Sequence, residues 1–349
     1  GYRSLVSLLD TVSQTEPAVA PPLPDLPRRV HATGFEFIEF SVDEQAKTEL
    51  TTTLSSLAFR KERSHRSKSV ELWRQGAVNI VVNSESKGLA AEARGIHGPC
   101  VCDMGLRVKD AEQTVRRALM LGAPEFSQPV GSGELDIPAI KGVGGSVVHF
   151  IDEKSDLHRV WDIEFDPVPK AKAPQPAGLR RIDHVAQTMR YQEMQSWLTY
   201  YLSTFDMEKA DIVDVIDPSG LIQSQALSSP EGEVRLNLNG ADQRQTFAGA
   251  FLSKGFGAGV QHIAFASDDI FETSAQLHAA GLERLTIPAN YYEDLRVRFD
   301  LEDEILEALR FGNILYDNDG AGEYFQIYST TFCSRFFFEI VERRRGYEG

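Results

Sequence analysis

The chain has 349 residues, of which 51 are Asp or Glu and 36 are Lys or Arg, so its formal net charge is −15. Such an acidic surface repels phosphate backbones and anionic headgroups, which excludes nucleic acid and a membrane surface as expected partners. Apolar runs stay well below the roughly 18 residues of a spanning helix, and residues 1–20 lack the pattern of a signal peptide. Three cysteines are too few for a disulfide framework, so we expect a cytoplasmic protein.

The first elements of the chain look separate from the rest. Residues 1–16 carry Leu5, Leu8, Leu9 and Val12 at helical spacing, which predicts a short amphipathic helix. Five prolines between residues 17 and 27 then predict a stiff, extended linker. The folded unit is therefore expected to begin near His31.

A second proline cluster divides the remaining chain. It spans residues 167–176 and again predicts a linker, because proline lacks the backbone donor that helices and sheets need. The predicted organisation has four parts: the end of a preceding domain with its linker (1–30), a first half (31–166), a linker (167–180) and a second half (181–349).

The two halves read as copies of each other. Val101–Asp110 alternates like a strand and precedes a helix that ends at Gly122, and Val260–Asp269 precedes a helix that ends at Gly281. The offset between the copies is 159 residues throughout, and strand-like runs near residues 34 and 181 open each half. Repeats of this length indicate duplicated modules in an α+β fold with mixed sheets.

Three polar residues of the second half stand on apolar strand faces. His184, His262 and Glu339 each alternate with hydrophobic neighbours, and they are spaced about 78 residues apart. A buried imidazole or carboxylate must be paired or must bind a metal. Two histidines and a carboxylate on one face of an iron ion leave positions for a substrate and dioxygen. The spacing alone equally allows three unrelated, hydrogen-bonded core residues.

The motifs around these residues resemble those of the 4-hydroxyphenylpyruvate dioxygenase family. The similar segments are Asp183-His184-Val185, residues 259–265 and 337–343 in the second half, and residues 65–70, Gln75-Gly76 and 140–145 in the first. The resemblance runs from about residue 32 to the end. It implies the vicinal-oxygen-chelate fold, with two βαβββ modules in each half and the metal in the second half.

The resemblance also implies the ligands of the site. His184, His262 and Glu339 would hold one divalent metal, with Fe(II) expected and Mg(II), Mn(II) or Co(II) able to replace it during purification. Each imidazole would be oriented by a partner on its other nitrogen. In the first half, Phe37 and Asp103 stand where His184 and His262 would be, so that half is expected to lack the triad.

Six further residues match the substrate contacts of that family, and they suit an aromatic or 2-oxo acid ligand: Ser224, Asn239, Gln261, Gln326, Tyr328 and Phe337. Some positions depart from the family pattern. Asn237 and Gly240 replace a proline and an acid, Tyr328 replaces a phenylalanine, and Arg335 is expected to draw an anion towards the cavity. The family closes its cavity with a C-terminal helix, whereas this sequence ends ten residues after Glu339.

The N-terminal residues resemble the last helix of a xylose-isomerase-like barrel. A barrel helix followed by dioxygenase-like halves is similar to bacterial 3-dehydroshikimate dehydratases in which such a barrel is fused to a dioxygenase-like part. Two functions follow as expectations. The first is non-heme dioxygenase chemistry on a 2-oxo acid. The second is an accessory role in a homo-oligomeric fusion, in which the domain binds metal and supports a barrel that converts 3-dehydroshikimate to protocatechuate.

Overall fold

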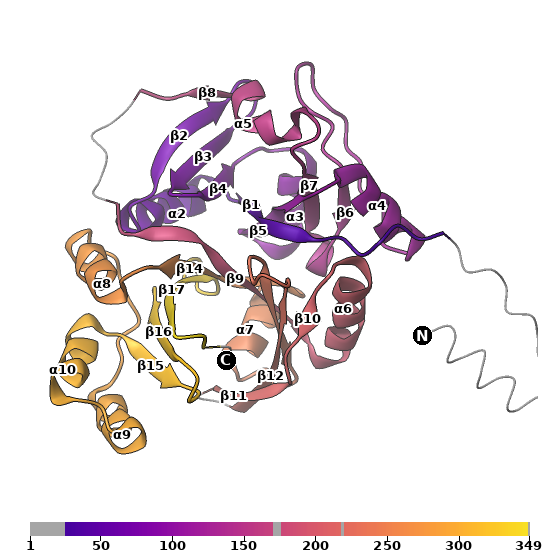
Figure 1. Cartoon of the computed structure of the whole chain (residues 1–349). Coiled ribbons are helices and arrows are strands. Elements are labelled where there is room, and N and C mark those ends of the chain that lie inside the picture. Colours follow the sequence, from indigo (N-terminus) through magenta and orange to yellow (C-terminus); the bar gives the residue numbers. More distant parts are fainter. Residues whose placement is uncertain (1–24, 170–175, 218–219, 348–349) are drawn as a thin grey trace, which may run out of the picture.

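A computed structural model describes residues 25–169, 176–217 and 220–347 (Figure 1). The helix expected over residues 1–16, most of the first proline-rich segment and residues 170–175 of the second lie outside these ranges. The described chain forms two curled mixed sheets, one from each half, with helices on their outer faces (Figure 1). This is the α+β architecture that the repeat predicts.

The first half forms a sheet with the strand order β6-β7-β5-β1-β4-β3-β2-β8. Its strands are β1 (Ala32–Ser41), β2 (Arg60–His65), β3 (Val70–Gln75), β4 (Val78–Asn83), β5 (Cys100–Val108), β6 (Ala139–Lys141), β7 (Val147–Ile151) and β8 (Phe165–Pro167). Its helices are α2 (Glu44–Ser56), α3 (Gly88–His97), α4 (Ala111–Met120) and α5 (Val160–Ile163), with 3₁₀ turns at Val143–Gly145 and Asp156–Arg159.

The second half forms a sheet with the order β10-β12-β13-β9-β14-β17-β16-β15, and β11 pairs with β12 beside this path. Its strands are β9 (Leu179–Arg190), β10 (Glu208–Lys209), β11 (Val213–Asp217), β12 (Gly220–Ser228), β13 (Arg235–Ala241), β14 (Gly259–Ser267), β15 (Leu315–Asn318), β16 (Glu323–Tyr328) and β17 (Phe337–Arg344). Its helices are α6 (Tyr191–Thr204), α7 (Phe247–Lys254), α8 (Ile270–Ala279), α9 (Ala289–Phe299) and α10 (Asp303–Gly312).

Both sheets have the same central topology. In the first, β1 runs antiparallel to β5 and parallel to β4, and β5 runs parallel to β7. In the second, β9, β14, β13 and β17 repeat these relations. Even the isolated bridge Glu125↔Ile140 of the first half has a counterpart in the second, Arg284↔Ser329, whereas β15 has no counterpart among the described strands of the first half.

The helix boundaries predicted from the repeat are confirmed. The side chain of Asp110 accepts from the backbone N–H of Gln113 at the start of α4, and Asp269 accepts from Glu272 at the start of α8. Beyond the two helix ends, Gly122 and Gly281 take φ values of 91° and 80°, the left-handed region that favours glycine. Equivalent residues therefore start and stop equivalent helices.

One hydrophobic core runs through both halves. Phe40 of β1 packs against Phe336 and Phe338 of the second half, with ring centroids 5.0 and 6.0 Å apart. Phe59 meets Phe265 at 5.4 Å in the same cluster of buried residues. These contacts join the sheets into one packed unit.

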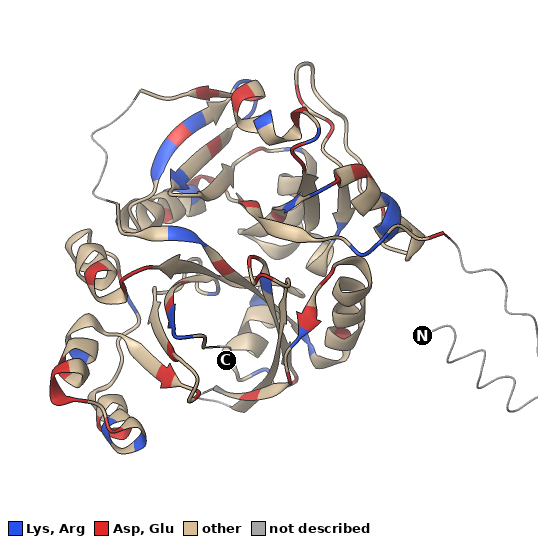
Figure 2. Cartoon of the chain, viewed as in Figure 1, with Lys and Arg blue, Asp and Glu red and all other residues tan. Residues whose placement is uncertain are grey.

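Charged side chains of both signs are interspersed over both halves (Figure 2). Helices in the described ranges are all too short or too polar to cross a membrane.

Candidate metal centre

Three neighbouring strands of the second sheet carry the predicted metal ligands. His184 lies on β9 opposite Ala264 of β14, and Ala264 in turn lies opposite Glu339 of β17. His262 is two residues before Ala264, so its side chain emerges on the same face. His184 and Glu339 are buried, and the side chain of His262 is 13% exposed. The sheet register thus converts residues far apart in sequence into one cluster.

The side-chain atoms of the cluster converge. His184 Nε2 lies 3.3 Å from His262 Nε2 and 3.2 Å from Glu339 Oε2, and His262 Nε2 lies 3.5 Å from the same oxygen. Ligand atoms about 2.1 Å from one ion and at right angles lie about 3 Å apart. The donor set and its spacing therefore fit a divalent metal bound through one face, with other coordination positions left for small ligands.

The charges of the cluster favour a cation at its centre. Burial opposes a charge on His184, but Glu339 and Asp183 outweigh it and raise the pKa of His184 to about 9. Burial lowers the pKa of His262 to about 4 although Glu339 opposes this. Glu339 is buried, yet its neighbours, His184 foremost, hold its pKa below the usual range. A metal ion would supply the positive charge that these carboxylates favour.

A buried carboxylate orients one of the two imidazoles. Asp183 Oδ1 lies 3.0 Å from His184 Nδ1, which leaves Nε2 facing the cluster. Arg343 donates to Asp183 from Nη2 at 3.1 Å, and Arg235 lies 3.5 Å from its other oxygen. The expectation of such a partner fails for His262, whose Nδ1 is buried without a hydrogen bond among the described residues.

The role of Asp183 was missed because it depends on a β-bulge. Neighbouring side chains of a strand normally point to opposite faces. The β9–β14 register shifts between Ala264↔His184 and Phe265↔Ile182, which leaves Asp183 as the extra residue. Such a bulge re-aims a side chain, so Asp183 can reach the imidazole of its own neighbour. The available signal was a carboxylate directly beside the histidine in an apolar run.

Three of the predicted substrate contacts lie against the cluster. Gln326 donates from Nε2 to Glu339 Oε1 at 2.8 Å and to the Tyr328 hydroxyl at 3.0 Å. Phe337 stacks on the His262 ring with centroids 4.7 Å apart, and Tyr328 meets Phe337 edge-on at 5.6 Å. An amide and an aromatic wall therefore border the metal position.

The other three predicted contacts form a separate polar row. Ser224 of β12 lies opposite Asn239 of β13, and Asn239 lies opposite Thr188 of β9. Thr188 donates from its hydroxyl to Gln261 Oε1 at 2.6 Å, and Gln261 is the extra residue of a second bulge, between Val260 and His262. Thr188 was not predicted, although it alternates with His184 along one face of β9. Four residues of strand, about 13 Å, separate this row from His184.

The expectation that Arg335 draws an anion towards the metal site is wrong. Arg335 lies away from the metal cluster: its Nη1 donates to the backbone oxygen of His97 at 2.5 Å, and its guanidinium packs on the Phe251 ring. The turn before it explains this direction, because Cys333 and Ser334 both have positive φ, 47° and 58°. Arg335 thus points towards the first half.

The first half places other residues at the equivalent positions. Phe37 of β1 lies opposite Gly105 of β5, and Gly105 lies opposite His149 of β7, which repeats the row of His184, Ala264 and Glu339. Asp103 takes the place of His262, and its Oδ2 lies 2.6 Å from His149 Nδ1. The Phe37 ring fills the space above Gly105, where an added Cβ would lie 2.4 Å from it.

Two family models match the chain, one on each half. The model described as "Hydroxyphenylpyruvate dioxygenase, HPPD, N-terminal" matches residues 28–166. The model described as "Glyoxalase/Bleomycin resistance protein/Dioxygenase superfamily" matches residues 181–321. The fold and these matches define a protein of the vicinal-oxygen-chelate superfamily, as predicted.

Sequence relatives assign the chain to one family within this superfamily. The chain is 34% identical over 322 residues to a 4-hydroxyphenylpyruvate dioxygenase from Pseudomonas sp. (strain P.J. 874), covering 89% of this chain and 88% of that protein. The chain therefore belongs to the 4-hydroxyphenylpyruvate dioxygenase family. It is also 42% identical over 317 residues to a 3-dehydroshikimate dehydratase from Pseudomonas putida, covering 90% of this chain but 50% of that protein.

Solved structures agree with both comparisons. A protein named "xylose isomerase-like TIM barrel/4-hydroxyphenylpyruvate dioxygenase fusion protein" matches with a TM-score of 0.82 and 38% identity, covering 100% of this chain and 56% of that one. A mutant 4-hydroxymandelate synthase from Streptomyces coelicolor shares the fold, with a TM-score of 0.76, 22% identity and coverage of 91% and 95%. The chain thus spans about half the length of its dehydratase and fusion relatives.

Proposed function

We propose that the chain binds one divalent metal ion, Fe(II), through His184, His262 and Glu339 and acts on a 2-oxo acid with dioxygen. The observation that carries this proposal is the convergence of the three ligand atoms, which lie 3.2–3.5 Å apart on a buried strand face. When bound, Fe(II) supplies open coordination positions at which a bidentate oxo acid and dioxygen can meet. Membership of the 4-hydroxyphenylpyruvate dioxygenase family supports the same chemistry.

The residues around the ligands would then divide the work of binding. Asp183 holds the proton of His184 on Nδ1 and keeps Nε2 available. Gln326 fixes one oxygen of Glu339 and leaves the other towards the two imidazoles. Phe337 covers the His262 ring and restricts water. Ser224, Asn239 and Gln261 would bind the far, oxygen-bearing end of an aromatic substrate, and their polar row on neighbouring strands supports this role.

Elemental analysis of the purified protein tests the metal site. We expect about one divalent metal per chain in the wild type and almost none in His262→Ala. Asp103→Ala, at the equivalent position of the first half, serves as the matched control and should retain the metal. Equal metal content in the wild type and His262→Ala would refute the site.

Oxygen consumption tests the chemistry. The Fe(II)-loaded chain should consume dioxygen with 4-hydroxyphenylpyruvate or another aryl pyruvate, and His262→Ala should not. A chain that holds iron but consumes no oxygen with any aryl pyruvate would leave the metal site standing and exclude the proposed reaction.

The half-length match to the dehydratases favours a second candidate function. In a longer, homo-oligomeric protein, residues 31–349 would bind metal and support a fused barrel that converts 3-dehydroshikimate to protocatechuate. The 38% identity to the fusion structure across the whole chain motivates this proposal. Deleting residues 31–349 from the fusion should then lower dehydratase activity or change the oligomeric state. A barrel that keeps both properties would contradict the supporting role.

A further inference from the structure

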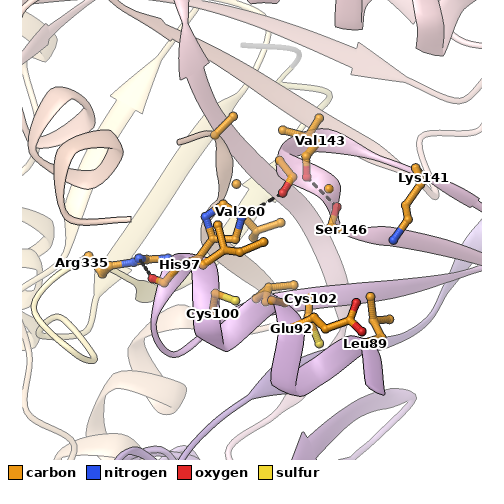
Figure 3. Close-up of a pocket in the computed structure, with 17 residues that line it drawn as sticks. Leu89, Glu92, His97, Cys100, Cys102, Lys141, Val143, Ser146, Val260 and Arg335 are labelled. Carbon is orange, nitrogen blue, oxygen red and sulfur yellow. Dashed lines mark hydrogen bonds between the residues drawn. The ribbon is translucent and has the colours of Figure 1, made fainter. Parts of the chain in front are cut away.

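A cavity of about 200 Å³ lies between the two halves, separate from the metal cluster (Figure 3). One wall comes from α3, β5 and the loop after β6, and the other from the start of β14 and from Arg335. The approach of the halves here depends on Gly144, since a Cβ at that position would lie 2.0 Å from the oxygen of Ala258. A cavity of about 150 Å³ accepts benzene, so this one has room for a small organic molecule.

Arg335 brings an unpaired positive charge to one end of the cavity, beside His97 (Figure 3). In the described ranges, no carboxylate lies within ion-pair distance of its guanidinium, and its Nε is buried without an acceptor. The only described hydrogen bond of its side chain runs from Nη1 to the backbone oxygen of His97. Burial lowers the pKa of Arg335, as expected for a cation without a counter-ion. In a chain of net charge −15, such a cation is well suited to an external anion.

The middle of the cavity suits a hydrocarbon body. Lys141 lies at the end opposite Arg335 (Figure 3). Its Nζ lies over the Phe126 ring, 4.5 Å from the centroid. Between the two ends, apolar side chains of Ile96, Val143 and Val260 line the cavity. An anion is therefore favoured at the Arg335 end, where the guanidinium carries a buried Nε without an acceptor among the described residues.

We propose that this cavity is a binding site for a small monocarboxylate, whose carboxylate pairs with Arg335 and whose apolar body lies against Ile96, Val143 and Val260. Guanidinium and carboxylate form charge-assisted hydrogen bonds, which are the strong class of such bonds. Both halves line the site, so the ligand binds only when they are seated together. Val260 also lies two residues before the metal ligand His262, which links the two sites through one strand.

Calorimetric titration with benzoate tests the proposal, with benzamide as the neutral probe of the same shape. We expect benzoate to bind and benzamide to bind at least tenfold more weakly. His262→Ala should bind benzoate as well as the wild type does, because it disables only the metal cluster. Absence of benzoate binding, equal binding of benzamide, or loss of binding in His262→Ala would each overturn the proposal.

Variants of the cavity locate the site. Arg335→Gln should weaken benzoate binding at least tenfold, and Arg335→Lys should keep part of it. Ala93→Leu, which fills the cavity without changing charge, should also weaken it. The control Arg159→Gln removes an exposed arginine elsewhere and should bind as the wild type does. Unchanged binding in both Arg335→Gln and Ala93→Leu, with thermal unfolding showing both folded, would place benzoate elsewhere and refute the site.

Discussion

The two halves share three β-bulges at equivalent positions but surround them with different residues. Among the extra residues are Asp183 and Gln261 in the β9–β14 ladder, and Glu36 and Cys102 in the β1–β5 ladder. Each half therefore aims an acidic side chain to the same place. The half with two histidines and a glutamate makes a candidate metal centre, whereas the other fills that space with Phe37.

The partners of the two acids explain this difference. Asp183 contacts the ring of His184 and two arginines, Arg343 and Arg235. Glu36 instead accepts from the indole of Trp161 at 2.7 Å and from Arg107 at 2.5 Å. The buried acid is thus satisfied in both halves. The buried acid is therefore common to both halves of the fold. Only in the second half does a neighbouring histidine, His184, allow the acid to orient a metal ligand.

Installing the missing ligands would test whether three side chains make the difference. The triple variant Phe37→His, Asp103→His and His149→Glu gives the first half the donor set of the second. We expect metal content to rise from about one to about two per chain, because the strand registers match. Elemental analysis after dialysis measures this. A variant that folds but holds one metal would assign the difference to the aromatic packing around Phe37.

Removing the metal should destabilise the second half and leave the first half unchanged. A ligand present at 100 times its Kd stabilises the folded state by about 2.7 kcal/mol. We therefore expect a chelator to lower the free energy of unfolding by about that amount and to leave His262→Ala unaffected. In hydrogen exchange, amides of β9, β14 and β17 should lose protection and those of β1, β5 and β7 should keep it. Equal loss of protection in both halves would contradict the comparison.

The two acids should respond differently to neutralisation. Asp183→Asn should weaken metal binding about 10- to 100-fold, because the acceptor on His184 Nδ1 loses its negative charge. Glu36→Gln should leave metal binding unchanged and lower stability by about 1–3 kcal/mol, because glutamine has no charge and offers one acceptor oxygen to the two donors, Arg107 and Trp161. Metal titration and denaturant unfolding of both variants measure these effects. If the metal affinity fell equally in Asp183→Asn and Glu36→Gln, the proposed difference between the two acids would be wrong.

The smallest effect is expected from an acid of the first half, Glu39. Burial, with Asp103 adding to it, raises the pKa of Glu39 from 4.5 to about 7. Between these values the unfolded chain releases a proton that the folded chain retains, so stability falls as pH rises through that window. Glu39→Gln cannot titrate, so we expect its stability to fall less than that of the wild type as pH rises through this window. Urea unfolding from pH 4.5 to 8 measures this, and parallel curves for both proteins would contradict it.

Local sequence patterns predicted the repeated architecture well. Asp110 with Gly122 and Asp269 with Gly281 mark helix ends by backbone chemistry that needs no tertiary context. Alternation put His184, His262 and Glu339 on apolar strand faces, but the spacing alone also allowed three unrelated core residues. That they share one site was predicted from the family resemblance.

Features that depend on register or on turn geometry could not be read from the sequence. Asp183 reaches His184 through a bulge, which exists only once β9 is paired with β14. Thr188 faces the site because of its distance from His184 along the strand, and a threonine on a strand is otherwise unremarkable. Arg335 turns away because two residues before it adopt left-handed backbone conformations. Each of these depends on tertiary context rather than on residue type.

The shared aromatic core gives the two faces of β1 unequal tolerance to change. Phe37 lies in a cluster confined to the first half, with Trp161 and Phe165, whereas Phe40 faces the aromatic rings of the second half. A change around Phe37 should therefore disturb packing within the first half, because that cluster does not reach the second half. Around Phe40, the first half packs against aromatic rings of the second half. A substitution on that face would therefore shift the strands that carry His262 and Glu339. The first half is thus constrained less by a metal site of its own than by its packing against the second half.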